Sequence, residues 1–165
     1  MSTARLVLTG LLALLIGGAF VHSLVSEQAA PDIVFSTLKG EKIALEALRG
    51  KVVLVNFWAT TCAACVREMP GMIDTYHRYR NKGFEILAVA MPYDPPNYVL
   101  KFTHDRQLPF PVALDIRGEA VRAFGNVNLT PTSFLIGKDG LILEKKTGEL
   151  DFAGLKATLD KHLGV

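Results

Sequence analysis

Cysteine and clustered charge are both scarce in this sequence, and each scarcity excludes a class of protein. Only two cysteines occur among 165 residues, too few for the disulfide framework of a small secreted domain. The 18 basic and 16 acidic residues are dispersed, so the chain lacks the basic face of a nucleic-acid-binding protein. The four histidines have no metal-ligand spacing, and we expect no metal site. The length suits one domain with an appendage.

The N-terminal region contains one long apolar run. Residues 6–25 include no Lys, Arg, Asp or Glu. A helix of that length spans ~30 Å, the thickness of the hydrocarbon core of a bilayer. Arg5 precedes the run and Glu27 follows it, which favours a cytoplasmic N-terminus. The sequence therefore predicts a cytoplasmic N-terminus (1–5), a transmembrane signal-anchor (6–25), a linker (26–30) and an exported domain (31–165).

A cleaved signal peptide is the alternative interpretation of the same run. Cleavage would need small residues at two nearby positions, and Glu27 or Gln28 interrupts the candidates near Ala29 and Ala30. We therefore favour the uncleaved anchor. Both interpretations export the domain to a compartment that permits disulfides. We expect the domain at the bacterial inner membrane, facing the periplasm or the cell exterior.

The two cysteines, Cys62 and Cys65, lie between a strand pattern and a helix pattern. Residues 52–58 are mostly apolar and rich in β-branched side chains, which predicts a buried strand, and a helix follows to about residue 80. Unpaired N–H groups and the positive dipole end at a helix start favour a thiolate. The pair therefore predicts a redox site in which Cys62 is the nucleophile and the deeper Cys65 resolves the mixed disulfide. A purely structural disulfide is the less favoured alternative.

The rest of the exported part alternates strands and helices. Hairpins are predicted at residues 33–45 and 133–147, strands at 84–90 and 112–114, and helices at 97–106, 119–124 and 151–163. Asp151 is placed as the N-cap of the last helix. Parallel strands joined by helical crossovers, together with an antiparallel hairpin, predict an α/β fold with a mixed central sheet covered on both faces.

Several segments of the exported part resemble one known family. These are the strand 53–60, the cysteine pair, Glu68-Met69-Pro70, Thr130-Pro131-Thr132-Ser133-Phe134 and Lys138-Asp139-Gly140. In this order and spacing they resemble the thioredoxin fold, and specifically the TlpA/ResA-like exported thiol–disulfide oxidoreductases. The resemblance covers residues 31–165. It implies a thioredoxin fold whose sheet is flanked by helices and preceded by an N-terminal β-hairpin and a transmembrane helix.

Three positions depart from the family pattern. Thr61 stands where the family usually has tryptophan, and Ala64 stands where it often has proline. Asn56 replaces the acidic residue that cytosolic thioredoxins bury in this strand. These departures concern the redox potential and the choice of partner rather than the fold.

The resemblance also implies where a substrate binds. Pro131 is expected to follow a cis peptide bond, which would turn the Thr130 backbone towards Cys62. There it could pair with an extended substrate segment. Trp58 is a further candidate for substrate contact, with core packing as the favoured interpretation of this residue.

Glu68 is the candidate acid of the site. It lies three residues after Cys65 and therefore on the same face of the predicted helix. The resemblance assigns the matching glutamate a role in cysteine reactivity. A half-buried carboxylate could accept the Cys65 proton or raise the thiol pKa values. The alternative is an ordinary solvated charge on a helix.

The predicted function is that of a membrane-tethered thiol–disulfide oxidoreductase. The resemblance implies that it reduces protein disulfides, often those of apocytochrome c before haem attachment, and that it uses no cofactor. It implies a membrane disulfide reductase of the DsbD/CcdA type as the electron donor. The residue types between the cysteines do not specify the redox potential.

Two other functions would use the same cysteines. A peroxiredoxin-like peroxidase needs a Thr-x-x-Cys pattern, and none ends at Cys62. A copper-binding carrier is less favoured still, because two thiolates leave the metal shell incomplete.

Overall fold

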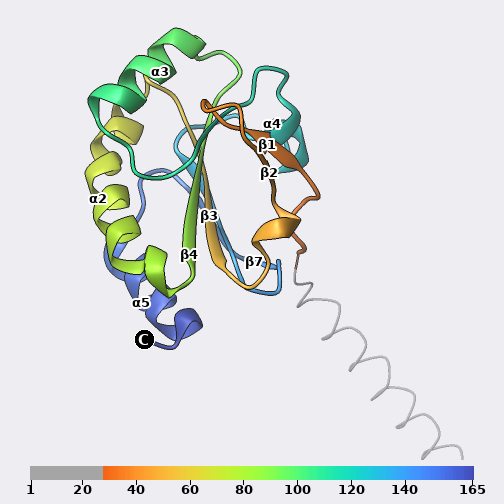
Figure 1. The fold of residues 1–165 in the computed structure, drawn as a ribbon, viewed down its shortest axis with the longest axis vertical. Coiled ribbons are helices and arrows are strands. Elements are labelled where there is room, and N and C mark those ends of the chain that lie inside the picture. Colours follow the sequence, from red (N-terminus) through yellow and green to blue (C-terminus); the bar gives the residue numbers. More distant parts are fainter. Residues whose placement is uncertain (1–27) are drawn as a thin grey trace, which may run out of the picture.

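A five-stranded mixed sheet forms the centre of the protein in the computed structural model, which describes residues 28–165 (Figure 1). The strands lie in the order β5-β4-β3-β6-β7. Their bounds are β3 (Val52–Trp58), β4 (Phe84–Ala90), β5 (Val112–Leu114), β6 (Thr132–Ile136) and β7 (Ile142–Thr147). The β3, β4 and β5 strands are parallel, whereas β6 pairs antiparallel with both β3 and β7.

Helices cover one face of this sheet, and a hairpin with a short helix covers the other (Figure 1). The elements on the first face are α2 (Ala63–Tyr79), α3 (Pro96–Asp105) and α5 (Phe152–Leu163). Those on the second are β1 (Val34–Ser36), β2 (Lys42–Ala44) and α4 (Glu119–Ala123). The predicted α/β thioredoxin fold, with its mixed sheet and its N-terminal hairpin, is confirmed.

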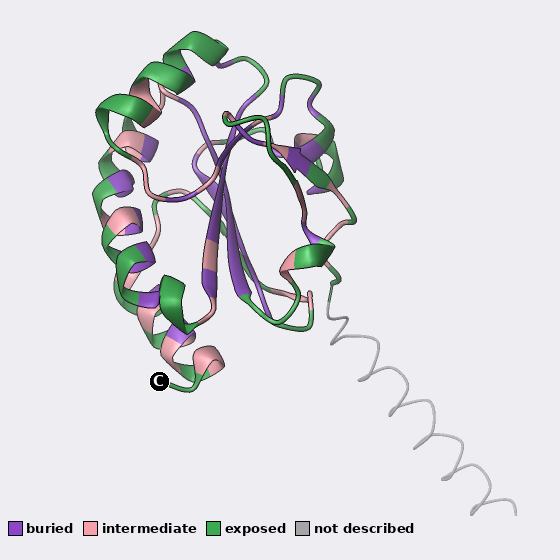
Figure 2. Ribbon diagram, viewed as in Figure 1, coloured by how far each residue is buried: buried purple, intermediate pink, exposed green. Residues whose placement is uncertain are grey.

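The β3 strand supplies side chains to both halves of the core. All seven of its residues are buried (Figure 2). Successive side chains of a strand point to opposite faces, so Val52, Leu54 and Trp58 pack on the helical side. Val53, Val55 and Phe57 pack on the hairpin side. This two-sided burial explains why the strand is nearly continuous in apolar residues.

The element bounds agree closely with the sequence-based expectations. The β3, β4 and β5 strands begin and end as predicted, and the other predicted helices and strands differ by about one residue at their ends. Two short 3₁₀ turns, η1 (Glu46–Leu48) and η2 (Arg80–Lys82), were not predicted. Asp151 caps α5 as expected, because its side chain accepts a hydrogen bond from the N–H of Ala153 at 3.0 Å.

The chain enters the described domain beside β7. Ala29 forms an isolated antiparallel bridge with Leu141, and the N–H of Ile142 donates to the carbonyl of Gln28 at 2.8 Å. Part of the predicted linker therefore lies against the domain. The predicted transmembrane segment, residues 6–25, is outside the described residues. Within residues 28–165, no helix has the length and apolar character needed to cross a membrane.

Candidate active site

The two cysteines sit where β3 passes into α2. Cys62 is the N-cap of α2 and has an extended backbone, while Cys65 lies in the first turn. The two Cα atoms are 5.3 Å apart, and the sulfurs form a disulfide. The Cys62 sulfur also accepts a hydrogen bond from the backbone N–H of Cys65 at 3.2 Å. One of the unpaired donors of the helix start is thus directed at the sulfur, as the sequence predicted.

The two sulfurs differ in access to solvent. Cys65 is completely buried, whereas Cys62 is partly exposed between the exposed residues Thr61 and Ala63. A partner can therefore reach only the Cys62 sulfur. This asymmetry suits a nucleophile and a resolving thiol, because attack on the partner and release of the partner then occur in a defined order.

The chemistry that this pair supports is a two-step exchange. In the reduced protein, the Cys62 thiolate attacks one sulfur of a partner disulfide and expels the other as a thiolate, which takes up a proton. Cys65 then loses its proton and attacks the Cys62 sulfur of the mixed disulfide. The Cys62–Cys65 bond forms, and the partner leaves as a dithiol that carries two electrons more than before.

The Thr130–Pro131 peptide bond is cis, which confirms the expectation for Pro131. Pro131 is buried, and its carbonyl accepts a hydrogen bond from the N–H of Gly148 at 2.8 Å. Thr132, which follows, pairs with Phe57 near the end of β3. The loop before β6 therefore lies at the end of the sheet from which β3 leads to Cys62.

Glu68 belongs to a buried polar network rather than to the solvent. Its side chain is 3% exposed. One carboxyl oxygen accepts a hydrogen bond from the Asn56 amide at 2.9 Å, and the other accepts one from the N–H of Leu150 at 3.1 Å. The same Asn56 amide group also donates to the Ser133 hydroxyl at 2.9 Å. The network ties α2 to β3, to β6 and to the segment before α5.

Burial raises the pKa of Glu68 above its ordinary value. The hydrogen bonds from Leu150 and Asn56 act in the opposite direction, and the negative charge of Glu149 adds to the increase. A carboxyl with a raised pKa holds its proton at a higher pH than a solvated one. Glu68 thus holds its proton more tightly than a solvated carboxyl does, and its role in cysteine reactivity stays a prediction.

The structure corrects the prediction of substrate contact for Trp58. Its side chain is completely buried and packs against Phe102 of α3, with ring centroids 5.1 Å apart. Trp58 is an even-numbered residue of β3, so it faces the helix-covered side of the sheet. Core packing, the favoured interpretation of the sequence, describes this residue.

One contact at the site was not foreseen from the sequence. Asp94, in the loop between β4 and α3, accepts hydrogen bonds from both the backbone N–H and the hydroxyl of Thr60. Thr60 lies two residues before Cys62. The only signal in the sequence was an acidic residue before Pro95 and Pro96.

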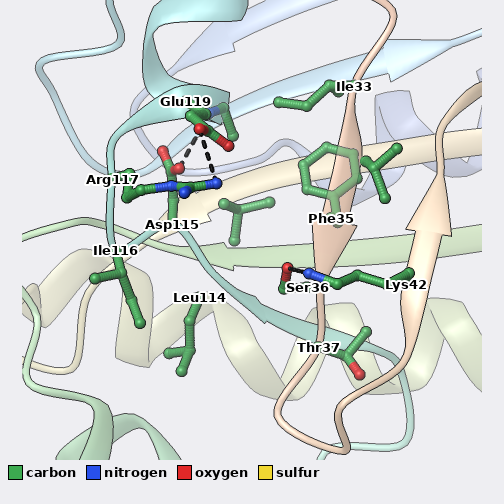
Figure 3. A pocket seen from close by; sticks show the side chains of 13 residues that line it. Ile33, Phe35, Ser36, Thr37, Lys42, Leu114, Asp115, Ile116, Arg117 and Glu119 are labelled. Atoms are coloured by element: carbon green, nitrogen blue, oxygen red, sulfur yellow. Dashed lines mark hydrogen bonds and ion pairs between the residues drawn. The ribbon is translucent and has the colours of Figure 1, made fainter.

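One cavity of the protein has no cysteine in its lining. Figure 3 shows a cavity of about 440 Å³ between β1 and the segment that joins β5 to α4. Phe35, Arg117 and Glu119 are among its lining residues, and none of the predicted site residues is. Among residues 28–165, no group of three or more His, Cys, Asp or Glu side chains is arranged to hold a metal ion.

Known proteins that are similar to this chain in sequence are named thiol–disulfide oxidoreductases. The thiol-disulfide oxidoreductase ResA of Bacillus thuringiensis subsp. konkukian is 41% identical over 133 residues, which are 80% of this chain and 75% of the relative. ResA of Geobacillus kaustophilus is 40% identical over 134 residues, which are 81% and 74% of the two chains. These relatives do not favour the peroxidase alternative.

A solved structure shares the fold. The thiol:disulfide interchange protein of Chlorobium tepidum, a thioredoxin family protein, superposes with a TM-score of 0.77 at 26% identity. The match covers 85% of this chain and 99% of that one. The AhpC/TSA family matches residues 26–145. The chain therefore belongs to the AhpC/TSA family and is a thiol–disulfide oxidoreductase similar to ResA, in which Cys62 and Cys65 form a disulfide.

Proposed function

We propose that this enzyme reduces disulfides in protein substrates outside the cytoplasm, while residues 6–25 tether it to the membrane. The observation that carries the proposal is the pairing of a reachable Cys62 with a fully buried Cys65 beside the Thr130–Pro131 loop. A buried resolving thiol is protected from solvent oxidants and reacts only after a partner has bonded to Cys62.

The surface beside the loop supports a polypeptide as the substrate. Leu129 and Tyr93 are each 61% exposed, although both are large and apolar. Leu129 directly precedes Thr130, and the Tyr93 hydroxyl lies 3.5 Å from the Thr130 hydroxyl. Exposed apolar side chains that border a reactive group are typical of protein-binding surfaces. An extended substrate segment would find backbone groups at Thr130 and apolar contacts on both sides of it.

The surroundings of the Cys62 sulfur support reduction rather than oxidation. Among the described residues, its only hydrogen-bond donor is the N–H of Cys65. Glu68, one helical turn beyond Cys65, disfavours additional negative charge whenever it is ionised. A carboxylate that disfavours the thiolate makes the reduced pair a better electron donor, which corresponds to a lower reduction potential.

The family resemblance supports a specific substrate and a specific electron donor. Apocytochrome c before haem attachment is the proposed substrate, and a membrane disulfide reductase of the DsbD/CcdA type is the proposed electron donor. The charge-free run at residues 6–25, preceded by Arg5, supports a single-pass anchor with the catalytic domain in the periplasm or outside the cell.

The direction of electron flow is tested by equilibrating the Cys62–Cys65 pair with dithiothreitol or glutathione buffers of known ratio. We expect a potential below about −230 mV, which corresponds to a reductant. A potential near about −120 mV would instead identify an oxidant and reject the proposal. Insulin reduction by the same preparation provides an independent activity readout.

The tether is tested in membranes of an expressing bacterial cell. The full chain should stay in the membrane after alkaline carbonate extraction, and protease added to spheroplasts should degrade its catalytic domain. A chain that lacks residues 1–25 should be found in the soluble fraction. Recovery of the full chain in the carbonate supernatant, or protection of the domain in spheroplasts, would contradict the proposed location.

A further inference from the structure

The Asp94 carboxylate satisfies both polar groups of Thr60 at once. One oxygen accepts the Thr60 backbone N–H at 2.6 Å, and the other accepts the Thr60 hydroxyl at 2.6 Å. Asp94 is 4% exposed, and among residues 28–165 it forms no ion pair. A buried carboxylate without a cation is unfavourable unless its hydrogen bonds are well formed. We propose that Asp94 is a positioning residue that holds the turn before Cys62 and thereby places the reactive sulfur.

The turn that Asp94 holds is short and leads directly to the sulfur. The N–H of Cys62 donates to the carbonyl of Ala59 at 3.1 Å, which closes the turn around Thr60. Cys62 then becomes the N-cap of α2. Any rotation of the Thr60 peptide would therefore change the direction in which the Cys62 side chain leaves the backbone.

Asp94 itself is fixed to rigid elements. Its N–H donates to the carbonyl of Met91 at 3.0 Å, and the N–H of Met91 donates to the carbonyl of Trp58 at 3.0 Å. The next residue, Pro95, is the N-cap of α3. Because Asp94 is anchored to the ends of β3 and β4 and to the start of α3, it can serve as a fixed point for the turn.

The same loop also reaches the substrate-binding side of the site. Tyr93, the neighbour of Asp94, places its hydroxyl 3.5 Å from the Thr130 hydroxyl. One short loop thus contacts the turn before Cys62 and the loop before Pro131. This arrangement fixes the nucleophile and the substrate-binding backbone relative to each other, which is the geometric requirement for in-line attack on a disulfide.

Asp94 would position Cys62 for the exchange reaction itself, whichever way the electrons flow. Without the Asp94 contacts, the Cys62 sulfur should spend less time at the start of α2. The thiolate would then lose stabilisation by the helix N-terminus, and the attack would be slower. Substrate binding through Thr130 should change much less, so the loss should fall on kcat rather than on KM.

The test compares two substitutions in the full-length enzyme. Asp94→Ala should lower kcat for insulin reduction by about tenfold or more. It should also move the midpoint of the pH profile of Cys62 alkylation, measured on reduced protein, to higher pH. Asp94→Asn should keep kcat within about threefold of the original, because an amide can accept from the Thr60 N–H and donate to its hydroxyl oxygen. Equal loss in both variants would overturn the inference.

Asp115 provides a matched control for general destabilisation. It is 7% exposed and accepts two hydrogen bonds, from the N–H groups of Ala120 and Val121 at 3.1 and 2.8 Å. It lines the cavity beside β1 (Figure 3), and neither cysteine is among the lining residues of that cavity. Asp115→Ala should lower the melting temperature without moving the alkylation profile. If Asp115→Ala moved the profile as far as Asp94→Ala, the positioning role would be refuted.

Thr60 offers a second route if Asp94→Ala fails to fold. Thr60→Ser keeps both donors and should behave like the original enzyme. Thr60→Val keeps the shape and the backbone N–H but removes the hydroxyl, and should lower kcat by about threefold or more. Identical rates for the two Thr60 variants would also overturn the inference.

Discussion

The substitution Glu68→Gln tests the energetics of the buried acid that accompanies the redox pair. The Glu68 carboxylate accepts one hydrogen bond from Asn56 and one from the N–H of Leu150. A glutamine side chain has a single acceptor oxygen, so one of these two donors must face an amide N–H group. Leaving a buried donor without a partner costs about 1–3 kcal/mol. At low pH we therefore expect the variant to be less stable than the original protein by about that amount.

A rise in pH should lower the stability of the original protein relative to that of Glu68→Gln. Burial raises the pKa of Glu68 in the folded protein above its ordinary value of 4.5. The folded state therefore holds this proton more tightly than the unfolded state does. The stability gained from that proton is fully present below about pH 4.5 and is lost as the pH rises through the folded-state pKa.

The pH dependence of stability that Glu68 contributes is limited, because only one proton is involved. The free energy of unfolding of the original protein, relative to that of Glu68→Gln, should decrease with pH by at most about 1.4 kcal/mol per pH unit. Glutamine does not titrate, so the variant lacks this term. The stability gap between the two proteins should therefore narrow, or reverse, between acid and neutral pH.

The assay is urea unfolding of the oxidised protein at intervals from about pH 4 to about pH 8. Trp58, the only tryptophan of the chain, is completely buried and reports unfolding by its fluorescence. Glu144→Gln is the control, because Glu144 is exposed on β7 and stays in water when the protein unfolds. A gap between the original protein and Glu68→Gln that stays constant or widens as the pH rises would refute the reasoning from burial.

The remaining predictions concern the cysteines, the core and one helix cap. Cys62→Ser should abolish insulin reduction, and Cys65→Ser should trap mixed disulfides that are visible on non-reducing gels; retained activity in the first, or no complexes in the second, would contradict the two-cysteine mechanism. Trp58→Phe should lower the free energy of unfolding by about 1–3 kcal/mol, measured by circular dichroism in urea, because the tryptophan ring packs in the core. Activity should be retained, and the substitution breaks no hydrogen bond, because the indole N–H has no partner among the described residues. Loss of activity without loss of stability would restore a substrate role. Asp151→Ala should cost about 1 kcal/mol through loss of the cap on α5, and an unchanged urea midpoint would argue against that cap.

Much of the fold follows from short stretches of sequence. The strand at Val52–Trp58 was predicted with its observed bounds because it is apolar on both faces, and a strand in the middle of a sheet must be. The Asp151 cap and the cysteine pair at the start of α2 depend on residues within one helical turn. Thr130 and Pro131 were identified by resemblance to a family, since the residues themselves do not distinguish a cis bond from a trans bond.

The partners of the buried polar groups could not be found in the same way. Trp58 was named as a candidate for substrate contact, although core packing was the favoured interpretation of this residue. Only the packing of α3 over this end of β3 places the side chain inside the protein. Glu68 was expected to be half-buried, and its burial depends on the segment before α5, more than eighty residues away in sequence.

The sequence by itself determined the redox chemistry, the strand that delivers Cys62 and the helix that receives it, because these depend on neighbouring residues and on local periodicity. The tertiary structure decided which partners the buried polar groups of this region meet. Asn56 meets Glu68 across 12 residues and Ser133 across 77, and Thr60 meets Asp94 across 34. Such pairs arise only when strands take up their register and helices dock on the sheet. Hydrogen bonds are short-ranged and directional, so no local pattern specifies a partner that distant parts of the fold bring into contact.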